Sequence, residues 1–390
     1  MAIAMENKRI LIIAGEASAD RYGARLVRKL LALHGSDSIC FYGTGGDEMQ
    51  KEGVHLLYHI RDLAHIGVRE ALSSLRTYYQ AYRQLVRYSA EHHPDLAILL
   101  DFPEFNLRLA KKLKRMGVRV VYYISPQIWA WRSGRIRTIR ACVDKMLVIL
   151  PFEEEYYRGR GVDAEFVGHP LLEDFSPIYE RDFYLSGLKL DPQRKTVAIL
   201  AGSRQKEIDY ILPTLLRAAL HLLKEIPAQF LISVAPTVEM NHINKVANRV
   251  LSEDLLKSNF RMISGNSRDI LANSDFAFVK SGTSSLEAAL VGVPFLITYK
   301  ISAFSWCIGS MLIHSPMKGL VNLIANEKIV PELYQSEAEP QELARLAIEF
   351  LASPEKSATM RSRLTEMREK LGARCASDAA ATTVSRYLRG

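Results

Sequence analysis

Residues Asp275 to Lys300, DFAFVKSGTSSLEAALVGVPFLITYK, contain the pattern that decides the fold. The apolar run 276–279 has the length of a strand, and Ser281-Gly282-Thr283 follows it and lets the chain turn sharply into a helix. Gly292-Val293-Pro294 then ends that helix, and a second apolar run covers 295–299. This order predicts an α/β unit in which the free N–H groups at the start of the helix favour an anion.

Glu287 stands inside this predicted helix and has two interpretations. It follows Ser284 by three residues, which is the spacing of a capping box. Alternatively, its carboxylate accepts the two ribose hydroxyls of a nucleotide whose phosphates face the start of the helix. The sequence leaves both interpretations open.

A second glycine turn lies upstream. The short apolar run 196–200 leads directly into Ala201-Gly202-Ser203-Arg204, and 207–224 has the pattern of a helix. Glycine allows the backbone to approach a ligand closely, and the planar guanidinium of Arg204 can hold phosphate oxygens. One such turn is weak support, but two in one half of the chain predict a pocket for a nucleotide sugar.

The composition is typical of a soluble globular enzyme with two domains. The chain has 390 residues, of which 48% are hydrophobic and 24% charged, and this length suits two domains of roughly 150–200 residues each. Cys40, Cys142, Cys307 and Cys375 lack the paired spacing of a zinc site or a disulfide framework, so we expect a reducing cytoplasm. No apolar run approaches the ~18 residues that a membrane span needs, and the start of the chain does not have the pattern of a signal peptide.

The charge balance predicts an anionic partner. Lys and Arg number 51 against 43 Asp and Glu, which gives a formal net charge of +8. The sequence has no zinc-finger, RNA-binding aromatic or basic-tail signature, so we expect no nucleic-acid partner. An anionic membrane surface explains the charge at least as well.

Strand and helix patterns alternate through both halves of the chain and predict an α/β fold with two doubly wound, Rossmann-like domains that face an interdomain cleft. We expect a first domain at 1–172, a second at 173–365, and a C-terminal helix at 366–390 that packs away from the second domain or back on the first. The proline-containing stretch 170–192 is predicted to be the linker. Glycosyltransferases of the GT-B type are built in this way. Strands are predicted at 9–15, 39–43, 96–100, 119–124 and 145–150, and near Thr196, Phe230, Arg261, Phe276 and Phe295.

Two acids in the first half are candidate catalytic bases. Asp101 directly follows the apolar strand 96–100, and burial at a strand end can raise the pKa of a carboxyl enough for it to accept a hydroxyl proton. Asp101 has a structural alternative, an N-cap or Asx-turn before the helix that follows. Glu16, in the loop Gly15 to Asp20, is the second candidate.

Aromatic and arginine side chains alternate in two first-half segments. Trp129 and Trp131 are followed by Arg132 and further arginines, which is a composition typical of a lipid–water boundary. A core role for the tryptophans beside a solvated helix face is equally consistent. The stretch 66–88 has a similar mixture and could receive acyl chains or pack on its own domain.

Taken together, the chain resembles the lipid-A-disaccharide synthase family of bacterial glycosyltransferases. The resemblance covers nearly the whole chain, in the order GEASAD at 15, GTGG at 43, DFPEFN at 101, SPQIWAW at 125, FVGHPL at 166, AGSRQKEI at 201, KSGTSSLEAAL at 280 and NLIANEKIVPELYQ at 322. It implies a GT-B fold and an inverting transfer of 2,3-diacylglucosamine from its UDP conjugate to the 6-hydroxyl of 2,3-diacylglucosamine 1-phosphate. The expected products are the β-1',6 disaccharide of lipid A and UDP.

The resemblance also assigns roles to individual residues. It implies that Asp101 is the base, with Glu16 beside it, and that Arg204 holds phosphate. Ala19, Ala201 and Lys280 depart from the family pattern, and Lys280 either adds a phosphate contact or faces solvent. The expected UDP-binding set is Gly202, Ser203, Arg204, Ser281, Gly282, Thr283, Glu287, Asn322 and Gln335, and the expected acceptor and lipid side is Asn106, Trp129, Trp131 and Arg132.

The implied transfer needs neither a cofactor nor a metal, since Arg204 and the helix start after Gly282 would neutralise the charge of the departing UDP. In agreement with this expectation, no Asp-x-Asp pair follows a predicted strand. The resemblance further implies a cytoplasmic enzyme bound peripherally to the anionic inner-membrane surface, and it suggests a homodimer. Two alternatives remain: another GT-B enzyme that uses a UDP-sugar, such as a UDP-GlcNAc 2-epimerase or a peptidoglycan glycosyltransferase, and a non-enzymatic module that binds nucleic acid.

Overall fold

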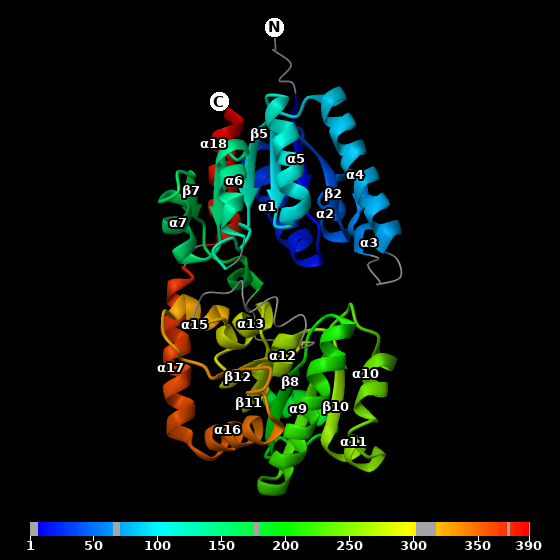
Figure 1. Ribbon diagram of the computed structural model, residues 1–390, viewed down its shortest axis with the longest axis vertical. Helices are drawn as coiled ribbons and strands as arrows, with labels where there is room; N and C mark the ends of the chain where they lie inside the picture. The colour runs from blue at the N-terminus through cyan, green and yellow to red at the C-terminus, as the bar shows by residue number, and fades with distance from the viewer. Residues whose placement is uncertain are drawn as a thin grey trace. The chain divides into compact units, whose positions relative to one another are not determined.

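The protein is described from a computed structural model that covers residues 7–64, 71–130, 132–174, 179–301, 317–372 and 375–389 (Figure 1). The chain forms two compact units. Unit 1 contains Met1–Glu173 and Leu371–Gly390, and unit 2 contains Asp174–Lys370. Each unit has its own parallel sheet, with helices on both faces.

Unit 1 has a seven-stranded parallel sheet with the strand order β3-β2-β1-β4-β5-β6-β7. Its central strands are buried because they are almost entirely apolar, and every residue of β4 is in the interior. The elements are β1 (Lys8–Ile13), α1 (Ala17–His34), β2 (Ile39–Gly45), α2 (Asp47–Lys51), β3 (His55–His59), α3 (Ile60–Ala64), α4 (Ala71–His92), β4 (Leu96–Leu100), α5 (Pro103–Arg115), β5 (Arg119–Tyr123), η1 (Ser133–Arg135), α6 (Ile136–Cys142), β6 (Lys145–Val148), α7 (Pro151–Arg158), β7 (Ala164–Phe166), η2 (Pro170–Asp174) and α18 (Ala376–Arg389).

Unit 2 repeats this architecture with a six-stranded parallel sheet in the order β10-β9-β8-β11-β12-β13. Its core includes the apolar faces of β8, β9 and α9, with Phe230 and Phe260 stacked at a centroid distance of 4.7 Å. The elements are α8 (Arg181–Gly187), β8 (Lys195–Leu200), α9 (Gln205–Glu225), β9 (Ala228–Val234), α10 (Met240–Ala247), α11 (Glu253–Asn259), β10 (Phe260–Ser264), α12 (Ser267–Ala272), β11 (Phe276–Lys280), α13 (Thr283–Val291), β12 (Phe295–Tyr299), α15 (Leu320–Ala325), β13 (Glu332–Tyr334), α16 (Pro340–Ala352) and α17 (Pro354–Lys370).

The final helix, α18, belongs to unit 1 and packs on α1 (Figure 1). Its apolar side chains, among them Ala381 and Val384, enter the same core as the first helix. Polar contacts fix its register, since the His34 imidazole lies 2.8 Å from the Ser385 hydroxyl and Lys29 pairs with Asp378 at 2.7 Å.

The predicted linker at 170–192 differs from the structure. The chain passes from unit 1 to unit 2 between Glu173 and Asp174, and α8 is part of unit 2. Arg181 in α8 is tied to unit 2, because its guanidinium donates to the Asp275 carboxylate at 2.9 Å and to the Asn273 carbonyl oxygen at 3.0 Å. The prolines and acids of this stretch resemble a linker in composition, but they do not reveal these long-range bonds.

Candidate active site

The candidate residues of unit 1 lie where the strand order of its sheet reverses. β1 pairs with β2 on one side and with β4 on the other, and ligands of doubly wound sheets bind beyond the carboxyl ends of such strands. Gly15 and Glu16 follow β1, and Asp101 follows β4. The fold therefore brings together the two acids that the sequence singles out.

The backbone at Asp101 is held in an uncommon conformation. Asp101 and Phe102 have φ angles of 46° and 49°, a left-handed pair that costs on the order of 1–3 kcal/mol per residue. The surrounding structure compensates, because the Asp101 carbonyl oxygen accepts hydrogen bonds from the Asn106 amide at 2.8 Å and from the Tyr122 hydroxyl. Asn106 also donates to the Leu100 carbonyl oxygen at 3.1 Å, and its side chain is buried. Asn106 thus holds the strand end that presents Asp101.

The structure excludes the capping role for Asp101. The N-cap of α5 is Phe102, which offers no side-chain cap, and Asp101 lies one residue before it. Burial, and after it the nearby negative charge of Glu16, raise the pKa of Asp101 to about 6, while the Phe102 backbone opposes the shift. A carboxyl of this kind is ionised near neutral pH and is basic enough to accept a proton.

Aromatic rings surround the turn that carries Asp101. Phe102 lies 5.6 Å from Tyr78 and 5.3 Å from Phe105 between ring centroids, and Tyr82 meets Phe105 edge-on at 6.2 Å. Burial and the charge of Glu16 raise the pKa of Tyr78. The described part of the predicted 66–88 segment thus contributes packing to this site, whereas Tyr79 is exposed. Residues 66–70 lie outside the described residues.

The loop after β5 is anchored by a buried acid that the sequence does not reveal. Glu153 is 1% exposed and accepts hydrogen bonds from the Trp129 indole N–H at 2.9 Å and from the Leu150 N–H at 3.2 Å. Burial raises the pKa of Glu153 to about 7, against the lowering effect of its hydrogen bond with Trp129. Trp129 is half-buried, with its ring edge-on to Phe152 at 5.0 Å.

Arg132 and Trp131 complete the predicted acceptor side. Arg132 is half-exposed and pairs with Glu104, which also pairs with Arg135. Trp131 lies outside the described residues.

The first anion turn of unit 2 lies at the corresponding switch point, beyond β8. Gly202 has a φ of 131°, and a Cβ at this position would overlap the Glu207 carboxylate, so glycine is required. Glu207 is buried and accepts the Ser203 backbone N–H at 3.0 Å. Arg204 is the N-cap of α9, and 73% of its side chain is exposed.

The second anion turn follows β11, the strand next to β8. Gly282, at a φ of 145°, is the N-cap of α13, and Thr283 begins the helix. A glycine N-cap brings no side-chain oxygen to the first N–H groups of the helix, which suits an anion. The Ser281 N–H donates to the Thr298 carbonyl oxygen at 2.9 Å, which ties the turn to β12.

Glu287 does not form the capping box that its spacing allows. Ser284 is the second residue of α13 rather than its N-cap, so the capping-box interpretation is wrong. The Glu287 carboxylate accepts from the Ser267 hydroxyl at 2.7 Å, and its side chain is half-buried.

Asn322 and Gln335 both bond to nearby backbone. Asn322 is fully buried, and its Oδ1 accepts from the N–H groups of Ile329 and Val330 at 2.9 and 3.0 Å. Its Nδ2 donates to the Glu332 carboxylate at 2.6 Å. Gln335, at a φ of 51°, aligns its amide with the backbone N–H and carbonyl of Ile301 at 3.2 and 3.1 Å. These bonds shape the turns on either side of β13.

The sequence does not predict the link between the two anion turns. Glu207 Oε1 lies 3.0 Å from the Lys280 ammonium and 3.6 Å from the Arg204 guanidinium. Glu207, in the first turn of α9, therefore connects Lys280, which ends β11, with Arg204, which precedes α9. The signal available in the sequence is an acid four residues after Ser203 on a helix whose other face is apolar.

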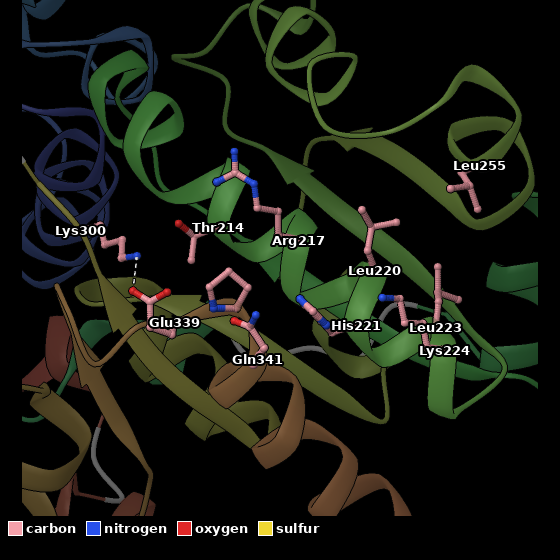
Figure 2. A pocket seen from close by; sticks show the side chains of 11 residues that line it. Thr214, Arg217, Leu220, His221, Leu223, Lys224, Leu255, Lys300, Glu339 and Gln341 are labelled. Atoms are coloured by element: carbon pink, nitrogen blue, oxygen red, sulfur yellow. Dashed lines mark ion pairs between the residues drawn. The ribbon is translucent and has the colours of Figure 1, made fainter.

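Unit 2 also has a surface groove of about 660 Å³ beside α9 and the start of α16 (Figure 2). Its basic side chains include Arg217, Lys224 and Lys300, and the Lys300 ammonium faces Glu339 at 3.8 Å. No residue of the predicted UDP-binding set lines this groove.

The described residues contain neither a candidate membrane span nor a candidate metal cluster. Across these parts of the chain, no helix combines the length and apolar character needed to cross a membrane. The same parts contain no group of three or more His, Cys, Asp or Glu side chains placed to hold a metal ion.

Comparison with known proteins identifies both sequence relatives and structural neighbours. The family model for lipid-A-disaccharide synthetase matches residues 10–385. The lipid-A-disaccharide synthase of Syntrophus aciditrophicus is 42% identical over 378 residues, which is 97% of each chain, and that of Geobacter metallireducens is 37% identical over 98% of each.

Among solved structures, UDP-GlcNAc 2-epimerase from Neisseria meningitidis bound to UDP-GlcNAc aligns with a TM-score of 0.67 at 12% identity, over 97% of this chain and 100% of that one. The calicheamicin glycosyltransferase CalG4 aligns with a TM-score of 0.61 at 14% identity, over 99% of both chains. These structural likenesses confirm the predicted GT-B class of fold.

Proposed function

Because the chain belongs to the lipid-A-disaccharide synthetase family, we propose that it condenses UDP-2,3-diacylglucosamine with 2,3-diacylglucosamine 1-phosphate. The products are the disaccharide 1-phosphate precursor of lipid A and UDP. The observation that carries this proposal is the family match over 10–385, which includes the turns that hold Asp101 and Arg204.

Asp101 is the proposed base. It removes the proton of the acceptor 6-hydroxyl as that oxygen attacks the anomeric carbon of the donor, and the bond from this carbon to the UDP oxygen breaks on the opposite face. The pKa of Asp101, raised to about 6 by burial, supports this role. Glu16 acts through its charge on Asp101 and is the second candidate base.

The proposed nucleotide site occupies unit 2. Arg204, the turn at Ser203 and the start of α13 at Gly282 and Thr283 would hold the diphosphate, whose negative charge grows as the glycosidic bond breaks. Glu287 would accept the ribose hydroxyls. Gly202 makes room for the Glu207 side chain and Ser281 ties the second turn to β12, while Asn322 and Gln335 shape the neighbouring turns.

We place the acceptor and its acyl chains beside Asn106, Trp129, Trp131 and Arg132. Since both substrates carry acyl chains, the enzyme would work at the cytoplasmic face of an anionic inner membrane, and the net charge of +8 supports this. Flotation with anionic vesicles that weakens as salt rises would agree with this placement, whereas equal, salt-insensitive flotation with neutral vesicles would contradict it. A homodimer, which the family resemblance suggests, is tested by sedimentation.

The experiment that tests the proposed reaction is turnover of the purified chain with both diacylated substrates in mixed micelles. Disaccharide and UDP are followed together, in parallel reactions with EDTA and with added Mg²⁺. Formation of disaccharide and UDP in equal amounts, in both the EDTA and the Mg²⁺ reactions, would support the reaction. Conversion of UDP-GlcNAc to its 2-epimer without disaccharide would favour the epimerase alternative, which is built on the same fold.

A further inference from the structure

The structure couples the two anion turns through a partly buried ion pair. Lys280 is the last residue of β11, Glu207 lies in the first turn of α9, and their charged atoms are 3.0 Å apart. Only 17% of the Lys280 side chain and 6% of the Glu207 side chain are exposed. A pair this shielded is screened far less by salt than a surface pair.

The Lys280 ammonium also lies against the second turn. A Cβ built on Gly282 would be 3.2 Å from Nζ, and Nζ lies 5.6 Å from the centroid of the Tyr299 ring. The cation is therefore held on one side by Glu207 and on another by the turn that begins α13. Its position reflects these contacts rather than attraction to bulk solvent.

Glu207 has two cations within reach, and they differ in exposure. Arg204 lies 3.6 Å away with 73% of its side chain exposed, whereas Lys280 is both closer and more shielded. Glu207 is fixed in place because it also accepts the Ser203 N–H and packs on Gly202. A buried carboxylate of this kind requires a compensating charge, and if Lys280 were absent, Arg204 would be the cation next to it.

We propose that Lys280 neutralises Glu207 and so leaves the Arg204 guanidinium available to the phosphates of a nucleoside diphosphate. Lys280 is then a positioning residue that acts through Glu207 and Arg204. The inference deepens the proposed function, because it rests on the assignment of these turns to UDP.

UDP affinity of the full chain, measured by calorimetry without acceptor, tests this inference. Lys280→Met should weaken UDP binding about tenfold or more, because Glu207 would then draw Arg204 toward itself. Lys280→Arg should keep the affinity within about threefold, because it keeps the charge. Lys206→Met is the matched control, since it removes the same charge from an exposed position of α9 and should also stay within about threefold.

The decisive variant is the double substitution Lys280→Met with Glu207→Gln. Glutamine keeps an oxygen for the Ser203 N–H but no longer needs a counter-charge, so the double variant should bind UDP as tightly as Glu207→Gln alone, within about threefold. A merely structural loss at position 280 would not be rescued in this way. Thermal unfolding of each variant checks that it is folded before affinity is compared.

Three results would overturn the inference. If Lys280→Met bound UDP with unchanged affinity, Lys280 would have no role in positioning Arg204. If the double variant bound UDP as weakly as Lys280→Met, Lys280 would contact the phosphates directly. Absence of UDP binding by the wild type would remove the site itself. Failure of the proposed function has a different signature, namely a wild type that binds UDP but forms no disaccharide.

Discussion

The ring of Phe102 lies so close to Gly15 that a Cβ added at this glycine would overlap the ring. Gly15 precedes Glu16, and Phe102 follows Asp101, so this one contact fixes the distance between the turns that carry the two acids. The left-handed backbone at Asp101 and Phe102 has room for the ring only because residue 15 has no side chain.

Gly15→Ala is therefore expected to displace Phe102 and the Asp101 turn. We predict a loss of stability of about 1–3 kcal/mol, as overpacking typically causes, together with a clear fall in kcat. Urea unfolding and disaccharide turnover measure the two effects. The control is Gly187→Ala, where a Cβ would have no neighbour within 4 Å. If Gly15→Ala and Gly187→Ala had the same stability and the same turnover, the contact between Gly15 and Phe102 would not control the Asp101 turn.

Asp101→Asn is expected to lower kcat by about 10²–10⁴-fold, because the amide cannot accept the proton of the acceptor hydroxyl. UDP affinity should change by less than about threefold, since the proposed nucleotide residues belong to unit 2. Turnover and calorimetry on the same preparation separate the two quantities. Near-normal turnover would remove Asp101 from the role of base.

The pH profile of turnover should depend on Glu16. The base must be ionised, so activity should rise through the pKa of Asp101, which burial raises to about 6 and to which Glu16 contributes. Glu16→Gln removes a negative charge that disfavours ionisation, so the pKa of Asp101 falls and the acidic limb of kcat/KM moves to lower pH. If the limb kept its position in this variant, another group would control it.

The central strands of both sheets could be predicted because they are continuous apolar runs. The predicted strand 96–100 coincides with β4, and 119–124 exceeds β5 by one residue. The sequence does not predict the edge strands β3, β7 and β13. β7 and β13 have only three residues each, whereas β3 is as long as β4 but is exposed or only partly buried along its length and has histidines at both ends.

The position of Asp101 at the sheet switch point could be predicted from the strand that precedes it. The pairing of Glu207 with Lys280 could not, because the two residues are 73 positions apart and meet only through the order of β8 and β11. The same holds for Glu153 and Trp129, which come from different segments and meet only in the folded unit. Sequence patterns identify turns that could bind anions, but they do not pair the charges between them.

Asn322→Ala is expected to destabilise unit 2. The substitution would leave the buried Val330 N–H without its acceptor, which costs about 1–3 kcal/mol. It would also take one of two acceptors from the Ile329 N–H and the Nδ2 donor from the Glu332 carboxylate. We therefore predict a fall of at least about 2 kcal/mol in the free energy of unfolding. Asn248→Ala, at an exposed asparagine that ends α10, is the control and should change it by less than about 0.5 kcal/mol. A stable Asn322→Ala protein with weakened UDP binding would instead favour direct ligand contact.

Glu153 should make the stability of the fold depend on pH. Its pKa, about 7 in the folded chain because of burial, exceeds the value of about 4.3 expected in an unfolded chain. The protonated acid therefore contributes stability that is fully present below about pH 4 and is lost as pH rises through about 7. The size of the effect is on the order of 3 kcal/mol, from 1.36 kcal/mol per pKa unit.

Glu153→Gln should remove this dependence, because the amide does not titrate and its oxygen can still accept the Trp129 N–H, although its NH2 group cannot accept the Leu150 N–H. Relative to wild type, the variant should gain stability between pH 5 and pH 8, measured by urea unfolding at both values. Glu155→Gln, on the exposed side of α7, should leave the wild-type dependence unchanged. If the stabilities of wild type and Glu153→Gln changed in parallel between pH 5 and pH 8, Glu153 would be ionised throughout this range. The Trp129 N–H would then donate to a charged carboxylate.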